Sequence, residues 1–250
     1  MLVSESAFVF FPNVLTSITN KVELLGGLLD FVLPPLCLGC GQFNDSPLCV
    51  CPACLEAIDI YDHPICLNCF QPVTSGVVCR ACDDRSFPLY AYGDYSAPLK
   101  DVVIQFKFKG ITSPAALFAK LILDKFEANL AAQPADWLVP VPLHPSRQAR
   151  RGYNQAALLA ERLSARLHLP VNQDIIERVR RRRPQARLDL RHRARNIRLV
   201  FEATPSEIED TPLILVDDVV TSGATMLEAR HTLEQAGYRV VAAISMAHGR

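Results

Sequence analysis

Residues 213–225 read LILVDDVVTSGAT, and this stretch decides how the rest of the sequence is interpreted. The run Leu213–Val216 is apolar without interruption, which is typical of a parallel strand covered on both faces. A turn rich in hydroxyl groups follows, and residues 226–236 have the spacing of an amphipathic helix that Gly237 ends. A second apolar run, Val240–Ile244, completes a strand–helix–strand unit. The sequence therefore predicts an α/β domain with a parallel sheet flanked by helices.

The turn after the first of these strands has the composition of a phosphate site. Hydroxyl groups, a flexible glycine and consecutive backbone N–H groups stand at the start of a helix, where anions are favoured. The residues expected to form it are Val219, Thr221, Ser222, Gly223, Ala224 and Thr225. Asp217 and Asp218 precede it, and adjacent carboxylates on an apolar strand are costly unless they face water, a metal or sugar hydroxyls. We therefore expect a ribose beside the phosphate, with an ordinary polar strand end as the alternative.

All nine cysteines lie between Cys37 and Cys82, and eight of them form four C-x-x-C pairs. Each pair places two thiolates on one side of a tight loop, so two pairs complete a tetrahedral zinc site. The expected ligands are Cys37, Cys40, Cys51 and Cys54 in one structural site and Cys66, Cys69, Cys79 and Cys82 in the other. Disulfides are the alternative, but a reducing cytoplasm and the repeated spacing favour zinc. Cys49 stands outside the pairs as an alternative ligand to Cys51.

The composition is that of a globular protein with an uneven distribution of charge. Half of the 250 residues are hydrophobic, and the formal net charge is zero. Arginines dominate residues 147–198 and include the run Arg180–Arg183, so this region should attract phosphates. We recognise no signal peptide and no stretch near the roughly 18 apolar residues of a membrane span. The expectation is a cytoplasmic protein without membrane insertion.

Apolar spacing predicts further elements between the cysteines and the phosphate turn. A strand rich in aromatic residues is expected over 89–95, followed by a helix from Leu99 that ends near Gly110. A second helix begins after Pro114, a buried strand covers 137–143, and a third helix runs over 154–167. His144 lies in the loop after the buried strand, where capping a turn is the simplest role for a lone histidine.

The complete string of apolar run, paired aspartates, Thr-Ser-Gly-Ala-Thr turn and helix resembles the signature that binds 5-phosphoribosyl 1-diphosphate (PRPP) in type I phosphoribosyltransferases. The resemblance implies that Asp217 and Asp218 hold the ribose hydroxyls and that residues 221–225 hold the 5′-phosphate. It also implies a magnesium ion that the substrate oxygens mainly hold, and displacement of pyrophosphate from C1 of the ribose. Residues 139–142 lie where these enzymes place their pyrophosphate loop.

The order of motifs resembles, more narrowly, the ComF family of competence-related proteins. Cysteine knuckles come first, followed by FKFKG at 106–110, RGYNQ at 151–155, LRHRARN at 190–196 and the phosphate signature. The resemblance implies a double zinc ribbon over 25–86 and a phosphoribosyltransferase-like domain over 87–250, behind an extension over 1–24. It further implies a cytoplasmic role in handling incoming single-stranded DNA during natural transformation, with DNA-uptake or recombination proteins as partners.

The basic motifs supply candidate contacts to pyrophosphate or DNA. Arg151 can fork onto a phosphate, and the ring of Tyr153 can stack on a base. An ordinary basic loop followed by a helix cap is the alternative for this motif. The candidates are Lys107, Lys109, Arg147, Arg150, Arg151, Tyr153, Asn154, Arg191 and Arg195.

Three functions fit these observations. The favoured one is an accessory protein of DNA uptake that binds PRPP or a nucleotide phosphate in its pocket and single-stranded DNA on its basic surface. The second is a working phosphoribosyltransferase of nucleotide salvage, although no base-specific motif is recognised. The third is a non-catalytic adaptor whose zinc ribbons bind partner proteins. No residue is assigned as a general base, and whether turnover occurs stays open.

Overall fold

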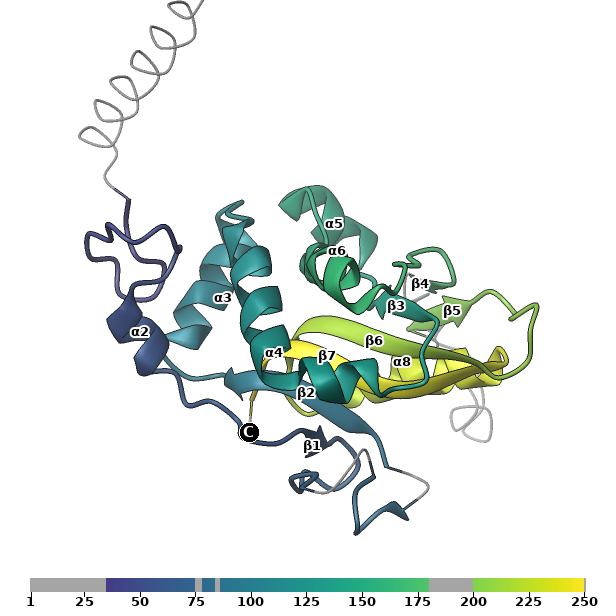
Figure 1. Ribbon diagram of the computed structural model, residues 1–250. Coiled ribbons are helices and arrows are strands. Elements are labelled where there is room, and N and C mark those ends of the chain that lie inside the picture. The colour runs from purple at the N-terminus through teal and green to yellow at the C-terminus, as the bar shows by residue number, and fades with distance from the viewer. Residues whose placement is uncertain (1–34, 75–77, 84–85, 180–199, 250) are drawn as a thin grey trace, which may run out of the picture.

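The computed structural model of the chain describes residues 35–74, 78–83, 86–179 and 200–249. Figure 1 shows a layered α/β molecule, with the first part of the cysteine-rich segment at the left beside α2 and its second part below the sheet near β1. In chain order its elements are α2 (Pro52–Glu56), β1 (Ile65–Cys66), β2 (Pro88–Asp94), α3 (Leu99–Phe108), α4 (Ser113–Ala131), β3 (Trp137–Pro140), α5 (Pro145–Arg151), α6 (Gln155–Leu167), β4 (Ile176–Arg178), β5 (Phe201–Ala203), β6 (Thr211–Val220), α8 (Ala224–Gln235) and β7 (Tyr238–His248).

A five-stranded sheet with the order β1-β2-β7-β6-β3 forms the centre of the molecule. The four strands β2, β7, β6 and β3 run parallel, and β1 pairs antiparallel with β2 at one edge. The predicted strand–helix–strand unit is β6–α8–β7, in which Val216 pairs with Ile244. Strands β4 and β5 form a separate antiparallel hairpin.

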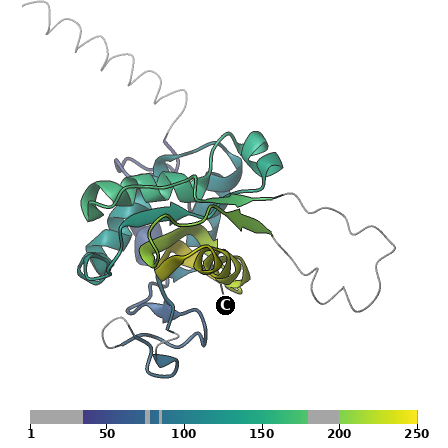
Figure 2. The same ribbon diagram turned by 90° about the vertical axis from the view of Figure 1, so that its right-hand side faces the viewer.

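Both faces of this sheet are covered. The helices α3, α4 and α6 share a core with Ile214 and Val216 of β6, whereas α8 and the β4–β5 hairpin share a second core with Leu213 and Leu215. Figure 2 shows α8 on the opposite side of the sheet from α4 and α6. Because alternate residues of a strand point to opposite faces, burial on both sides requires an unbroken apolar run. The predicted α/β class, with a parallel sheet flanked by helices, is confirmed.

The ends of several predicted elements differ in the structure, which also contains elements that the sequence analysis missed. The strand predicted over 137–143 ends at Pro140. β6 continues through Val220, so both aspartates belong to the strand, and α8 begins at Ala224. α5 was missed because none of its residues is buried, so it carries no apolar periodicity. The predictions for the extension over 1–24, for Arg180–Arg183 and for Arg191 and Arg195 concern residues outside the described ranges. Within those ranges, no helix is long and apolar enough to cross a membrane.

The cysteine-rich segment is joined to the sheet through its backbone. The N–H of Leu67 donates to the carbonyl of Phe87 at 2.9 Å, and the N–H of Asp94 donates to the carbonyl of Asp59 at 2.8 Å. Gly93 permits this close approach, since a Cβ atom there would lie 2.6 Å from the carbonyl oxygen of Asp59. The ribbons and the sheet therefore form one continuous structure.

Replacing Gly93 with alanine is expected to destabilise the protein by about 1–3 kcal/mol, because the added methyl group must push the segment at Asp59 away from β2. Urea unfolding followed by circular dichroism measures this change. An unchanged midpoint would show that the cysteine-rich segment does not dock on β2 as closely as the structure has it.

Candidate functional site

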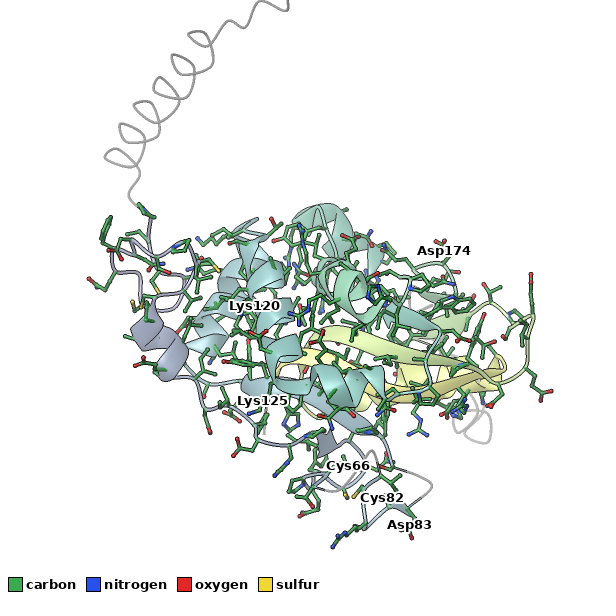
Figure 3. All side chains as sticks on the ribbon, in the orientation of Figure 1. Cys66, Cys82, Asp83, Lys120, Lys125 and Asp174 are labelled. Carbon is green, nitrogen blue, oxygen red and sulfur yellow. The ribbon has the colours of Figure 1, made fainter. Side chains whose placement is uncertain are left out.

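The eight paired cysteines form two clusters of four, in the sequential pairing that the spacing predicts. The sulfur atoms of each cluster all lie within 4.8 Å of one another, with Cys40 and Cys51 separated by 3.9 Å and Cys69 and Cys79 by 3.5 Å. Figure 3 labels Cys66 and Cys82 in the second cluster, close to each other. A tetrahedral zinc ion with Zn–S bonds of about 2.3 Å separates its sulfurs by roughly 3.8 Å. Both clusters therefore fit zinc.

The surroundings of the first cluster also suit a structural metal. The backbone N–H groups of Gly39 and Cys51 point at the sulfur of Cys37, at 3.3 and 3.2 Å, and such bonds stabilise a thiolate. Four sulfur ligands leave no coordination position open for a substrate, so these zinc ions would hold the fold together. Cys49 lies outside both clusters, and loss of hydration raises the pKa of its thiol.

The substitution Cys51→Ser is expected to lower the zinc content from two ions per chain to one, whereas Cys49→Ser should leave two. Mass spectrometry of the purified proteins measures the metal directly. Zinc loss in the Cys49 variant, with two ions kept in the Cys51 variant, would reverse the ligand assignment.

The two aspartates at the carboxyl end of β6 occupy different surroundings. Asp218 is buried on the side of α3, where the Lys107 amine lies 2.8 Å from its carboxylate. Asp217 is half-buried and points to the other face, as strand alternation requires. Its carboxylate accepts a hydrogen bond of 2.7 Å from the backbone N–H of Asp218. Lys107 thus neutralises one carboxylate and leaves the other beside the turn.

The turn after β6 presents backbone donors to a small cavity. Gly223 adopts φ +72° and is the N-cap of α8, without a side-chain cap for the first N–H groups of the helix. The cavity measures about 40 Å³, and Asp217 and residues 219–226 line it. All the predicted phosphate-site residues except Asp218, which faces Lys107 instead, therefore lie around one space at the start of a helix, where an anion is favoured.

Asp217 has an unusual affinity for its proton. Loss of hydration, followed by the neighbouring charge of Asp218, raises the pKa of the Asp217 carboxyl from 3.8 to about 7. The positive charges of Lys107 and Arg178 act in the opposite direction. Asp217 is therefore a carboxyl that changes charge near neutral pH.

The substitution Asp217→Asn is expected to stabilise the protein near neutral pH by on the order of 1 kcal/mol. The folded state keeps the Asp217 proton up to about pH 7, whereas the unfolded carboxyl releases it near 3.8, so this group lowers stability as the pH rises between those values. Urea unfolding at several pH values measures the effect. The advantage of the variant should grow across that interval, and a difference independent of pH would contradict the raised pKa.

The segment at 139–142, predicted as a pyrophosphate loop, runs along β6. The N–H of Val141 donates to the carbonyl of Val216 at 2.8 Å, which holds the end of β3 against β6. His144 then caps α5, with its Nδ1 accepting the N–H of Ser146 at 3.3 Å. The turn-capping role predicted for His144 is confirmed.

Basic side chains surround Phe108 at the end of α3. The guanidinium groups of Arg150 and Arg151 lie 6.0 and 5.1 Å from the centre of its ring. Phe108 itself is 58 % exposed, and Lys109, which follows it, and Arg147, which precedes Arg150 in α5, are also exposed. This surface combines cations with an aromatic face.

The RGYNQ motif has structural partners. The hydroxyl of Tyr153 donates to the carbonyl of Phe106 at 2.5 Å, and the amide of Gln155 donates to the same oxygen at 3.3 Å. Asn154 caps α6 by accepting the backbone N–H two residues on, and its amide donates to the carbonyl of Val141 at 3.1 Å. These bonds tie α3 and the loop after β3 to α6. A ligand role for Tyr153 and Asn154 stays a prediction.

The sequence analysis missed Arg178 and Phe108. Arg178 ends β4 with its guanidinium 5.4 Å from the ring centre of Phe201. Burial lowers the pKa of Arg178. The charges of Arg147 and Asp217 also influence this pKa, so Arg178 interacts electrostatically with the candidate site. No local pattern distinguished Arg178 from the arginine run that follows it.

Comparison with known proteins agrees with this architecture. A family model described as a double zinc ribbon domain matches residues 28–83. DNA utilization protein YhgH of Escherichia coli is 31 % identical over 199 residues, which are 77 % of this chain and 87 % of the relative. Competence protein F of Haemophilus influenzae is 30 % identical over 217 residues, or 84 % of this chain and 89 % of the relative.

Solved structures give weaker similarities. Orotate phosphoribosyltransferase from Aeropyrum pernix aligns with a TM-score of 0.35 and 18 % identity, over 56 % of this chain and 63 % of that one. An adenine phosphoribosyltransferase aligns with a TM-score of 0.35 and 16 % identity, over 58 % and 76 %. Because both scores are low, the fold class rests on the sheet order and helix placement described above. The sequence relatives, which extend over most of the chain, show that this protein belongs to the ComF family of competence and DNA-utilization proteins.

Proposed function

We propose that the carboxyl edge of β6 binds PRPP or a related nucleotide phosphate. The observation that carries this proposal is the single cavity that Asp217 shares with the first turn of α8. The backbone N–H groups of residues 221–225 would hold the 5′-phosphate, and Asp217 and Asp218 would accept the ribose hydroxyls. Phosphate and ribose then lie next to each other, as in any ribose 5-phosphate.

Cations from three separate elements support binding of the diphosphate group of PRPP, which is more highly charged than the 5′-phosphate. Lys107 of α3 contacts Asp218, and Arg178 of β4 and Arg147 of α5 lie in the same field. Positive charge around a diphosphate favours its binding and, in a transfer reaction, its departure from C1 of the ribose. The hard carboxylate oxygens suit a magnesium ion that arrives with the substrate and is held mainly by its oxygens.

Replacing both Asp217 and Asp218 with asparagine is expected to abolish binding of magnesium–PRPP in calorimetric titration. A neutral amide is a weaker hydrogen-bond acceptor for the ribose hydroxyls than a charged carboxylate. Binding in the micromolar range by the wild type corresponds to about −8 kcal/mol. Zinc content and the circular dichroism spectrum should stay unchanged. Asp217→Asn alone keeps the Lys107–Asp218 contact and serves as a milder variant.

Two outcomes would count against this assignment. Equal binding by the wild type and the double variant would remove the aspartates from the site. Loss of zinc together with PRPP binding would show that the substitutions damage the fold. Release of pyrophosphate in the presence of candidate acceptors is a separate measurement, which distinguishes an enzyme from a binding protein.

Membership of the ComF family supports a role in the handling of incoming single-stranded DNA in the cytoplasm. The surface formed by Phe108, Arg147, Arg150 and Arg151 favours this second function, since an exposed ring beside arginines suits stacked bases and a phosphate backbone. The predicted contribution of Arg180–Arg183, Arg191 and Arg195 belongs to the same proposal.

Replacing Arg147 and Arg150 with glutamine is expected to weaken single-stranded DNA binding and to flatten its salt dependence, by about 0.7 in the log–log slope for each phosphate that the protein no longer neutralises. Fluorescence anisotropy over a range of salt concentrations gives this slope. Arg162→Gln, an exposed change on α6, is a matched control. An unchanged slope would exclude α5 from the DNA-binding surface.

A further inference from the structure

A cavity of about 900 Å³ lies beside the phosphate turn, between the second zinc ribbon and the end of β7. Volumes of roughly 300–1,000 Å³ are typical of sites for small organic ligands. The ribbon side contributes mainly apolar and aromatic residues: Tyr61, Ile65, Phe70 and Pro72. Thr221 and Ser222 line this cavity and also the small phosphate cavity, so the two spaces adjoin.

The aromatic rings of the cavity are arranged as a stacking wall. The rings of Phe70 and His248 stack with centres 5.8 Å apart and an angle of 26° between their planes. Tyr61 approaches His248 from another side, with ring centres 6.1 Å apart. Phe70 is 48 % exposed, so it has surface to offer to a further planar ring.

The backbone at Phe70 shows that the aromatic side chain stands where a glycine would fit better. Residues 37–42 read CLGCGQ and residues 66–71 read CLNCFQ, so the two knuckles repeat one pattern. Gly41 has φ +72° and donates to the carbonyl of Cys37 at 2.8 Å, and Phe70 has φ 58° and donates to the carbonyl of Cys66 at 2.7 Å. Bulky residues rarely adopt this left-handed conformation. Such strain is concentrated at functional sites in proteins.

The same knuckle contacts the phosphate turn. A Cβ atom at Gly223 would lie 3.5 Å from the side chain of Leu67, which directly follows Cys66 in the first C-x-x-C pair of the second ribbon. The zinc ribbon therefore supports the turn and carries Phe70 to its side. A ligand whose phosphate is bound in the turn would be able to contact the aromatic rings of the larger cavity with another part of the same molecule.

We propose that this cavity binds a nucleobase, stacked against Phe70, while the ribose 5-phosphate of the same nucleotide occupies the site on β6 and its turn. The second zinc ribbon then forms the base-binding part of the nucleotide site. This inference rests on the proposed function of the phosphate turn. Its ligand class is a purine or pyrimidine nucleoside 5′-monophosphate, either free or at the 5′ end of a DNA strand.

The test compares adenosine 5′-monophosphate with ribose 5-phosphate by calorimetric titration of the zinc-loaded protein. The nucleotide is expected to bind at least about fivefold more tightly than the sugar phosphate, which is the effect of one stacked base. In Phe70→Gly this advantage disappears, while ribose 5-phosphate binds as before. The substitution gives the second knuckle the residue of the first, so zinc content and melting temperature are retained.

Further variants separate stacking from folding. Phe70→Tyr keeps an aromatic ring and is expected to keep the advantage of the nucleotide, whereas Phe70→Leu keeps an apolar side chain and loses most of it. Phe43→Ala removes an exposed phenylalanine of the first ribbon that does not line the cavity, and should change neither affinity. An oligodeoxynucleotide with a 5′-phosphate, titrated into the wild type and Phe70→Gly, distinguishes a DNA end from a free nucleotide.

The outcomes distinguish this inference from the proposed function. Binding of PRPP and ribose 5-phosphate with no gain from the base overturns the inference and leaves the phosphate site intact. If the nucleotide still binds more tightly than the sugar phosphate in both Phe70→Gly and Phe70→Leu, the inference is also overturned, because the base would then stack on a group other than Phe70. Absence of any binding by PRPP, ribose 5-phosphate and nucleotide rejects the proposed function and this inference together.

Discussion

Burial of β6 on both faces is the constraint on which the rest of the structure depends. The strand lies between a core shared with α3, α4 and α6 and a core shared with α8, and it remains apolar until Val216. Beyond that point it carries Asp217 and Asp218 to the carboxyl end of the sheet, where Asp218 and Val220 are still buried. The start of α8 lies at the same end of the sheet, so the Asp217 carboxyl group and the first turn of α8 line one cavity. Parallel sheets generally bind ligands there, since strand ends and helix starts coincide.

Zinc holds together the cysteine-rich segment, which has little apolar volume of its own. The second cluster shares a small core with Val73, whereas Leu67 packs into the core on the α8 side of the sheet. The knuckle is also bonded through its backbone to the chain just before β2. Metal–thiolate bonds can thus fix the position of Phe70 beside the phosphate turn without a large hydrophobic core. The second ribbon therefore lines the larger cavity as well as forming part of the fold.

Charge at the site is balanced across elements that are distant in the sequence. Lys107 compensates Asp218, which is buried, whereas Asp217 is exposed enough to line the phosphate cavity and retains a raised pKa. Arg178 approaches from the β4–β5 hairpin on the other side of the sheet. Before a ligand binds, the two carboxylates therefore repel each other less than their adjacency in sequence indicates.

The sequence by itself determined those features that depend on neighbours along the chain. Four C-x-x-C pairs indicated the two clusters, and the apolar run, aspartates and glycine turn indicated β6, the turn after it and α8, because thiolate geometry and strand or helix periodicity act over a few residues. Tertiary structure alone decided that Lys107 contacts Asp218, that the charges of Arg178 and Asp217 influence each other, and that Phe70 and Thr221 line one cavity. These pairs join segments separated by many residues, and they follow from how the helices, the hairpin and the ribbon dock on the two faces and the edge of the sheet.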